Sequence, residues 1–104
     1  DFKEMLLKAK NMQDKMKEAQ EKIKNIEVEG FGGGNLVKVI LTGDYELKSI
    51  IISEEAKKED QEIVNDLIVA AYNNAKENLK KKSAEELSKV TGGLNLPADF
   101  KLPF

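Results

Sequence analysis

Lysine side chains supply most of the chemistry that the spacing in this sequence offers. Two series of lysines near the N-terminus recur every seven residues. They are Lys3, Lys10, Lys17 and Lys24, and Lys8, Lys15 and Lys22. Residues seven apart share one side of a helix, so the two series form two stripes of positive charge. Every basic residue in the chain is lysine, which lacks the planar fork that arginine offers to guanine. Any contact with nucleic acid should therefore favour phosphates over bases.

A second group of lysines lies toward the C-terminus. It comprises Lys76, Lys80, Lys81, Lys82 and Lys89. Few apolar residues accompany these lysines, which leaves a thin apolar edge on this part of the helix. We therefore expect it to protrude as an arm. The plainer alternative for this group, and for the two N-terminal stripes, is a solvated helix face laced with ion pairs between residues four apart.

Lysines and acidic residues are spread unevenly along the chain, although the net charge is only slightly negative. The net charge of -2 and the pI near 5.3 count against nucleic-acid binding. However, residues 1–26 carry seven lysines against five acidic residues, and residues 67–104 carry six against four. Residues 44–66 carry eight acidic residues against three lysines. The helical ends are mildly basic and the middle is acidic.

The composition excludes whole classes of site. The chain has no cysteine and no histidine, which removes disulfides, thiolate and imidazole metal sites, and histidine-centred catalysis. Only carboxylates and lysines remain as acid-base groups, so an enzyme is the weakest interpretation. No apolar run approaches the roughly 20 residues that a membrane span needs. We expect a cytoplasmic protein with no cofactor, no metal, no small-molecule substrate and no membrane partner.

The 104 residues are expected to form a single α+β domain. An apolar seam with spacings of three and four predicts a helix over about residues 2–25. Its members are Phe2, Met5, Ala9, Met12, Met16, Ala19, Ile23 and Ile26. At ~1.5 Å per residue this helix would be on the order of 35 Å long, which is longer than a small sheet can cover. Part of it must project or pack on another chain.

Residues 26–52 predict a three-strand antiparallel meander. The cluster Gly30 to Gly34 is expected to reverse the chain after the first strand, and Thr42-Gly43-Asp44 after the second. No Gly-Lys-Ser/Thr sequence follows the glycines, which favours a plain connection over a phosphate-binding loop. Ile50, Ile51 and Ile52 are apolar on both faces of the third strand. We expect them to be covered on both, either by a partner subunit or by the chain's own helices.

A second long helix is expected over about residues 61–91. A short capped turn at Ser53 precedes it, Asp60 caps it, and Thr91-Gly92-Gly93 ends it. Its first half is densely apolar and should belong to the core. The tail over residues 92–104 is more apolar than a free terminus, and we expect it to dock in a groove of its own or a neighbouring subunit.

Four linked features carry a resemblance to a known family. They are Lys-Ala-Lys-Asn-Met-Gln-Asp-Lys-Met at 8–16, the glycine turn before Leu36-Val37-Lys38-Val39, Val-Ala-Ala-Tyr-Asn-Asn-Ala at 69–75, and the closing Thr91-Gly92-Gly93-Leu94 with Leu96-Pro97 and Phe100-Lys101-Leu102-Pro103-Phe104. Along nearly its whole length the chain resembles the bacterial YbaB/EbfC family of nucleoid-associated proteins. The resemblance implies an α-β-β-β-α fold and a homodimer whose paired helical arms are shaped like tweezers.

The resemblance also implies binding of duplex DNA in the nucleoid, with a role in chromosome organisation and in some cases gene regulation. The lysines of the two helices would then contact phosphates and release counterions, so affinity should fall steeply with salt. The predicted DNA-binding residues are Lys3, Lys8, Lys10, Lys15, Lys17, Lys76, Lys80, Lys81, Lys82 and Lys89.

A competing hypothesis is a dimeric protein-interaction module. The methionine-rich seam and the apolar tail would suit such a module, because methionine surfaces adapt to partner helices or peptides. The acidic pI also agrees with it. Retention of a protein partner after nuclease treatment would favour this alternative.

Overall fold

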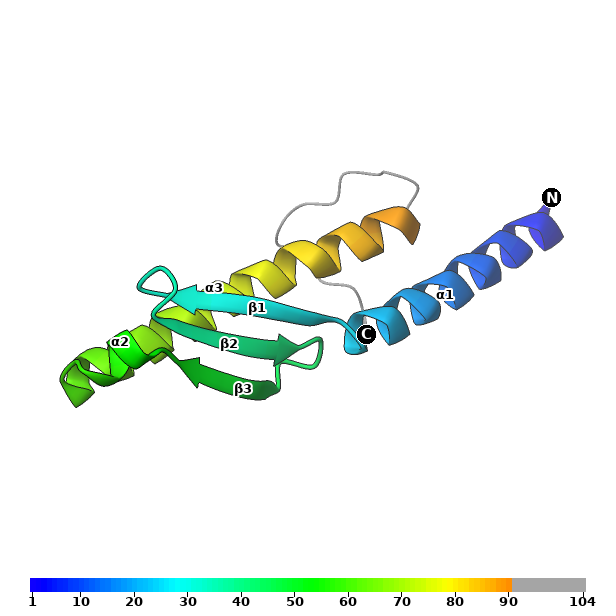
Figure 1. Ribbon diagram of the computed structural model, residues 1–104. Coiled ribbons are helices and arrows are strands. Elements are labelled where there is room, and N and C mark those ends of the chain that lie inside the picture. The colour runs from blue at the N-terminus through cyan, green and yellow to red at the C-terminus, as the bar shows by residue number, and fades with distance from the viewer. Residues whose placement is uncertain (91–104) are drawn as a thin grey trace.

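The computed structural model describes residues 1–90, and residues 91–104 lie outside the described part. Its elements are α1 (Phe2–Lys24), β1 (Glu27–Gly32), β2 (Val37–Thr42), β3 (Leu47–Ile52), α2 (Glu54–Lys57) and α3 (Gln61–Val90). The predicted order of one helix, three antiparallel strands and a second long helix is confirmed. The molecule is elongated, with extents of 68 × 23 × 18 Å, and α2 and the N-terminus lie at opposite ends (Figure 1).

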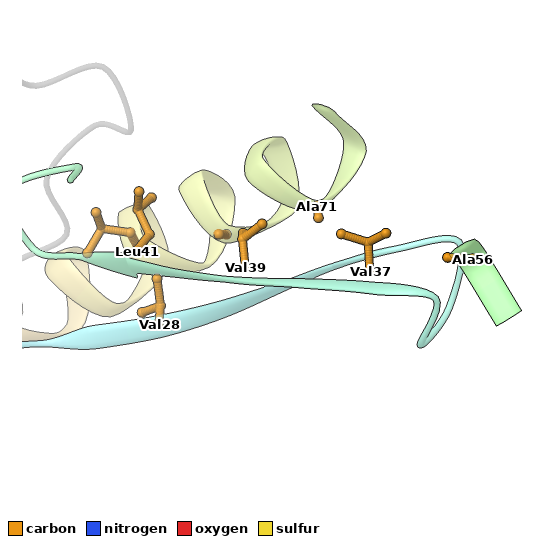
Figure 2. Close-up of a cluster of buried hydrophobic side chains, with 8 residues drawn as sticks. Val28, Val37, Val39, Leu41, Ala56 and Ala71 are labelled. Atoms are coloured by element: carbon orange, nitrogen blue, oxygen red, sulfur yellow. The ribbon is translucent and has the colours of Figure 1, made fainter. Parts of the chain in front are cut away.

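The three strands form a meander in the order β1-β2-β3, with both neighbouring pairs antiparallel. Val37, Val39 and Leu41 alternate with more exposed residues along β2 and point toward α3 (Figure 2). Ala71 and Ala75 of α3 are also fully buried in this core. Because α3 presents small residues to the sheet, helix and strands approach closely.

The glycine cluster has two roles rather than the single one predicted. Gly33 and Gly34 have φ values of 61° and 72° and form the reversal between β1 and β2. Gly30 and Gly32 lie within β1, where Ala71, Ala75 and Leu67 of α3 pack directly against them. A glycine at these two positions serves close packing rather than a turn.

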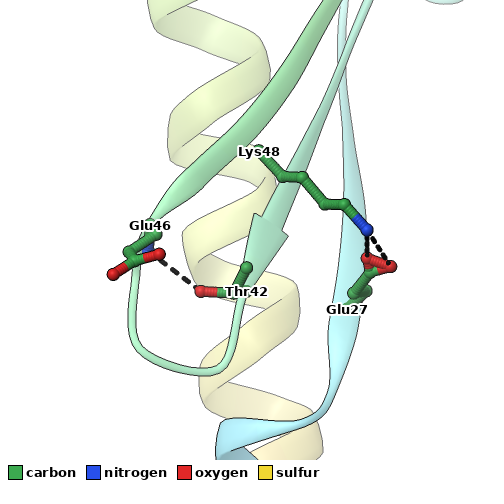
Figure 3. A network of polar contacts seen from close by, with 4 residues as sticks. All are labelled: Glu27, Thr42, Glu46 and Lys48. Atoms are coloured by element: carbon green, nitrogen blue, oxygen red, sulfur yellow. Dashed lines mark hydrogen bonds and ion pairs between the residues drawn. The ribbon is translucent and has the colours of Figure 1, made fainter.

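The second turn is closed by a threonine side chain. Thr42 Oγ1 accepts a hydrogen bond from the backbone N–H of Glu46 at 3.2 Å (Figure 3). It accepts another from the backbone N–H of Asp44 at 3.3 Å. Tyr45 takes a φ of 63° within this turn. As predicted, Ser53 caps a short helical turn, accepting from the N–H of Ala56 at 3.1 Å. Such side-chain caps satisfy backbone donors that the turns leave free.

The two edges of the sheet differ. On β1, the N–H of Phe31 donates to Asn74 Oδ1 at 2.9 Å, and the carbonyl of Glu29 accepts from Asn78 Nδ2 at 2.9 Å. These asparagines from α3 occupy backbone groups on the outer side of β1. On the other edge, β3 pairs with β2 alone among residues 1–90, and Ile50 and Ile51 remain 43% and 48% exposed. The helices among residues 1–90 therefore leave Ile50 and Ile51 largely uncovered, whereas Ile52 packs against the core.

Replacing both asparagines with alanine should open the capped edge. We expect Asn74→Ala with Asn78→Ala to cost about 2 kcal/mol of unfolding free energy, because two hydrogen bonds to the backbone of the edge strand are lost. The variant should also aggregate faster on concentration, since an uncapped edge strand accepts other chains. Urea unfolding and light scattering measure the two effects. Asn73→Ala, an exposed neighbour on α3, is the matched control, and equal behaviour of the two variants would contradict the capping role.

The second half of α3 protrudes less than its composition suggested. Leu79 is fully buried in the sheet core, although Lys80, Lys81 and Lys82 follow it. Beyond Leu79, α3 packs against α1, where Ala19 is the buried residue. The projecting part is instead the N-terminal half of α1. Phe2 and Met5 are 72% and 67% exposed there.

Candidate nucleic-acid interface

A groove runs between α1 and the C-terminal part of α3. It consists of two adjoining hollows of about 240 Å³ and about 320 Å³, which share Lys15 and Val90. Its lining residues are Lys8, Asn11, Met12, Lys15, Glu18, Ala19 and Lys22 from α1, and Glu86, Lys89 and Val90 from α3. We call this the α1–α3 groove. The heptad spacing of α1 places one whole lysine stripe along it.

Four lysines line the α1–α3 groove. They are Lys8, Lys15, Lys22 and Lys89. Lys22 was not among the predicted site residues, although its place seven residues after Lys15 was the signal that could have found it. Two carboxylates, Glu18 and Glu86, also line the groove, so it is basic without being uniformly positive.

The other predicted lysines lie elsewhere. Lys3, Lys10 and Lys17 form the second stripe on α1, which is exposed and lines neither hollow. The group on α3 comprises Lys76, Lys80, Lys81 and Lys82, all exposed and outside the groove. The ten predicted lysines therefore fall into three sets. Three line the α1–α3 groove, three lie on the other stripe of α1, and four lie on the exposed surface of α3.

Most of these ammonium groups are available to an external anion. Among the ten predicted lysines, only Lys81 and Lys89 form ion pairs with residues 1–90. Lys89 pairs with Glu86 at 3.1 Å, and Lys81 pairs more loosely with Glu77 at 3.9 Å. Ion pairs near the surface contribute little stability, so we expect a phosphate to compete with Glu77 and Glu86 for these two lysines. The solvated-face alternative predicted many such pairs along α1, but the described residues show only Lys24 with Glu21, at 3.8 Å.

The sheet offers no comparable basic surface. Lys48 Nζ lies 2.6 Å from Glu27 Oε2 across the strands (Figure 3), and Lys38 Nζ lies 3.0 Å from Glu29 Oε2. These pairs neutralise the lysines of β2 and β3. The acidic residues of α2 and the start of α3 lie at the end of the molecule opposite the N-terminus of α1 (Figure 1). The excess of acidic residues in 54–66 therefore lies at one end of the molecule, and the modest excess of lysine in α1 lies toward the other.

Two further observations concern other kinds of site. Within residues 1–90, no group of three or more acidic side chains is arranged to hold a metal ion. The helices in that same part of the chain are all too polar or too short to cross a membrane.

Comparison with known proteins agrees with the resemblance seen in the sequence. The model of the YbaB/EbfC DNA-binding family matches residues 1–94. A protein of Granulibacter bethesdensis that is named a nucleoid-associated protein is 46% identical over 101 residues. That alignment covers 96% of this chain and 94% of the relative. The chain belongs to the YbaB/EbfC DNA-binding family.

Proposed function

We propose that this protein binds duplex DNA through phosphate contacts and helps to organise the bacterial chromosome in the nucleoid, with an influence on gene expression. The observation that carries the proposal is the convergence of Lys8, Lys15, Lys22 and Lys89 on the α1–α3 groove. Family membership and the name of the relative support DNA as the ligand. The role is binding rather than catalysis.

Phosphate contacts would give the protein an affinity for DNA that does not depend on the base sequence. Each lysine that neutralises a phosphate releases a condensed counterion, so the logarithm of affinity falls with the logarithm of salt by about 0.9 per contact. Lysine side chains fix position on the backbone but do not distinguish base pairs as arginine forks do. We expect similar affinity for duplexes of unrelated sequence.

A matched pair of charge reversals tests the groove. Lys8→Glu, Lys15→Glu and Lys22→Glu together should lower affinity for a random-sequence duplex by roughly 100-fold at low salt, because three contacts become repulsive. The control reverses Lys3, Lys10 and Lys17 on the outer stripe and changes the net charge equally. Fluorescence anisotropy over a salt series measures both, and the groove variant should also show a shallower salt dependence.

Equal losses in the two variants would show that total charge, rather than the groove, governs binding. No binding by the unaltered protein even at low salt would overturn the proposal and favour the protein-interaction alternative. The lysines of α3 at 80–82 remain a second predicted contact. Reversing all three should weaken binding without altering the fold, because their side chains are exposed.

The proposal includes a homodimer that pairs two copies through β3. This strand is the uncapped edge of the sheet, whereas Asn74 and Asn78 occupy the β1 edge. Antiparallel pairing of β3 with its copy would complete the backbone hydrogen bonds and cover Ile50, Ile51 and Leu47, which are all exposed in one chain. The lysines on the helices of both copies would then bind the phosphates of one DNA duplex.

A charge on the free edge should prevent this pairing. Ile50→Lys is expected to give a folded monomer, because a charged edge residue opposes strand addition. Ile63→Lys on α3 is the control, since Ile50 and Ile63 are each 43% exposed but only Ile50 lies at the edge. Light scattering reports the mass of each variant. A dimeric Ile50→Lys variant would place the interface elsewhere.

A further inference from the structure

A poorly exposed carboxylate lies among the lysines of the α1–α3 groove. Glu86 of α3 lines the same hollow as Lys15, Lys22 and Lys89. Its side chain is 19% exposed, whereas the acidic partners in the other ion pairs of residues 1–90 are between 44% and 87% exposed. Glu86 is therefore the acidic partner with the least access to water.

Glu86 already holds one of the four groove lysines. Lys89 Nζ donates a hydrogen bond to Glu86 Oε1 at 3.1 Å, from one turn further along α3. The other groove lysines, Lys8, Lys15 and Lys22, form no ion pair with any of residues 1–90. The groove thus offers three unpaired lysines and one that is paired before any ligand arrives.

The low exposure of Glu86 makes this pair harder to exchange than the looser pair on the outer surface of α3. A phosphate that takes Lys81 leaves Glu77 in water, because Glu77 is 67% exposed. A phosphate that takes Lys89 leaves Glu86 as an unpaired charge with little access to water, which is costly. That phosphate would also lie close to the negative charge of Glu86. Both effects favour Lys89 staying with Glu86 when a polyanion binds.

We propose, on the basis of the DNA-binding function above, that Glu86 withholds Lys89 from the phosphates and so limits the affinity of the α1–α3 groove for DNA. Lys8, Lys15 and Lys22 then make the groove contacts of the unaltered protein. Lys89 is a fourth contact that becomes available only when the carboxylate is removed.

Glu86→Gln tests this role, because it keeps the size of the side chain and removes its charge. We expect the variant to bind a random-sequence duplex roughly 5-fold more tightly at low salt, with a salt dependence steeper by about 0.9, since one more lysine contacts a phosphate. Glu85→Gln is the control. Glu85 is exposed and lines neither hollow, and its replacement changes the net charge equally. Fluorescence anisotropy over a salt series measures both variants, and circular dichroism confirms that each is folded.

A second pair of variants tests whether Glu86 acts through Lys89. In a chain that carries Lys89→Gln, adding Glu86→Gln should leave the salt dependence unchanged, because no fourth lysine remains to be freed. A purely structural role of Glu86 would give the same change with and without Lys89. That result, or equal effects of Glu86→Gln and Glu85→Gln, would overturn the role of Glu86 and leave DNA binding intact.

Linear inorganic polyphosphate distinguishes a failure of this role from a failure of DNA binding. It presents phosphates without bases or a duplex, and titration calorimetry measures its binding to the same variants. If the duplex does not bind but Glu86→Gln alone strengthens polyphosphate binding, the DNA-binding proposal fails and the role of Glu86 stands. Failure of the protein to bind either polyanion would overturn both.

Discussion

Gly30→Ala is expected to destabilise the fold by about 3 kcal/mol, because the interface between β1 and α3 has no room for a methyl group. A Cβ atom at Gly30 would overlap the backbone carbonyl of Ala71 and the backbone nitrogen of Ala75. Those atoms belong to the rigid helix and cannot turn aside as a side chain can. The strand and the helix would have to separate, which would loosen the core around Val39. Equilibrium unfolding in urea measures the loss.

Gly34→Ala serves as the control for this substitution. A Cβ atom at Gly34 meets no other atom within 4 Å, but its φ of 72° lies in the left-handed region. We expect a cost of about 1 kcal/mol from the backbone alone. A Gly30 variant that is no less stable than the Gly34 variant would show that α3 can move away from β1 without penalty.

Leu79→Ala is the second change with a large expected effect. We expect it to lower the unfolding free energy by about 3 kcal/mol, since removing a fully buried leucine side chain leaves a cavity. Leu79 joins the core around β2 at the point where the lysine-rich part of α3 begins. Its loss should also loosen the packing of α3 beyond it, which positions Lys89 in the α1–α3 groove. Urea unfolding of the variant gives the free energy.

Ile63→Ala is the control for Leu79→Ala, because it truncates a side chain of similar size that is only partly buried. Ile63 lies on the same helix but is 43% exposed, so its truncation should cost less than 1 kcal/mol by the transfer of about half a side chain. If the two variants lost the same small amount of unfolding free energy, Leu79 would not be packed in the core. The lysine-rich half of α3 would then project from the core, as its composition alone suggests.

Periodicity predicted the order of the elements, because apolar spacing reports directly on helices and strands. The apolar seam identified α1 correctly, and the two turns predicted at Gly30 to Gly34 and at Thr42-Gly43-Asp44 correctly divided residues 26–52 into three strands. The burial of Leu79 was less visible. A single leucine among lysines gives little periodic signal, and only the line of Ala71, Ala75 and Leu79 against the sheet reveals its place.

The division of the lysines could not be read from the sequence. Both stripes of α1 have the same heptad spacing, and which stripe borders a groove depends on the side from which α3 packs. The roles of Gly30 and of Asn78 likewise depend on residues more than 40 positions away. Contacts between distant segments leave no local pattern, so spacing alone did not reveal them.

The capped edge of the sheet limits how far assembly can proceed. A chain with two open edges can add strands without end and form fibres. Here Asn74 and Asn78 close one edge, so each chain can contribute a single β-strand edge to strand pairing. Two chains joined at β3 would present only closed edges to the outside. Strand addition would then stop at two copies, and any larger array on DNA would have to be held together by the DNA itself or by helix contacts.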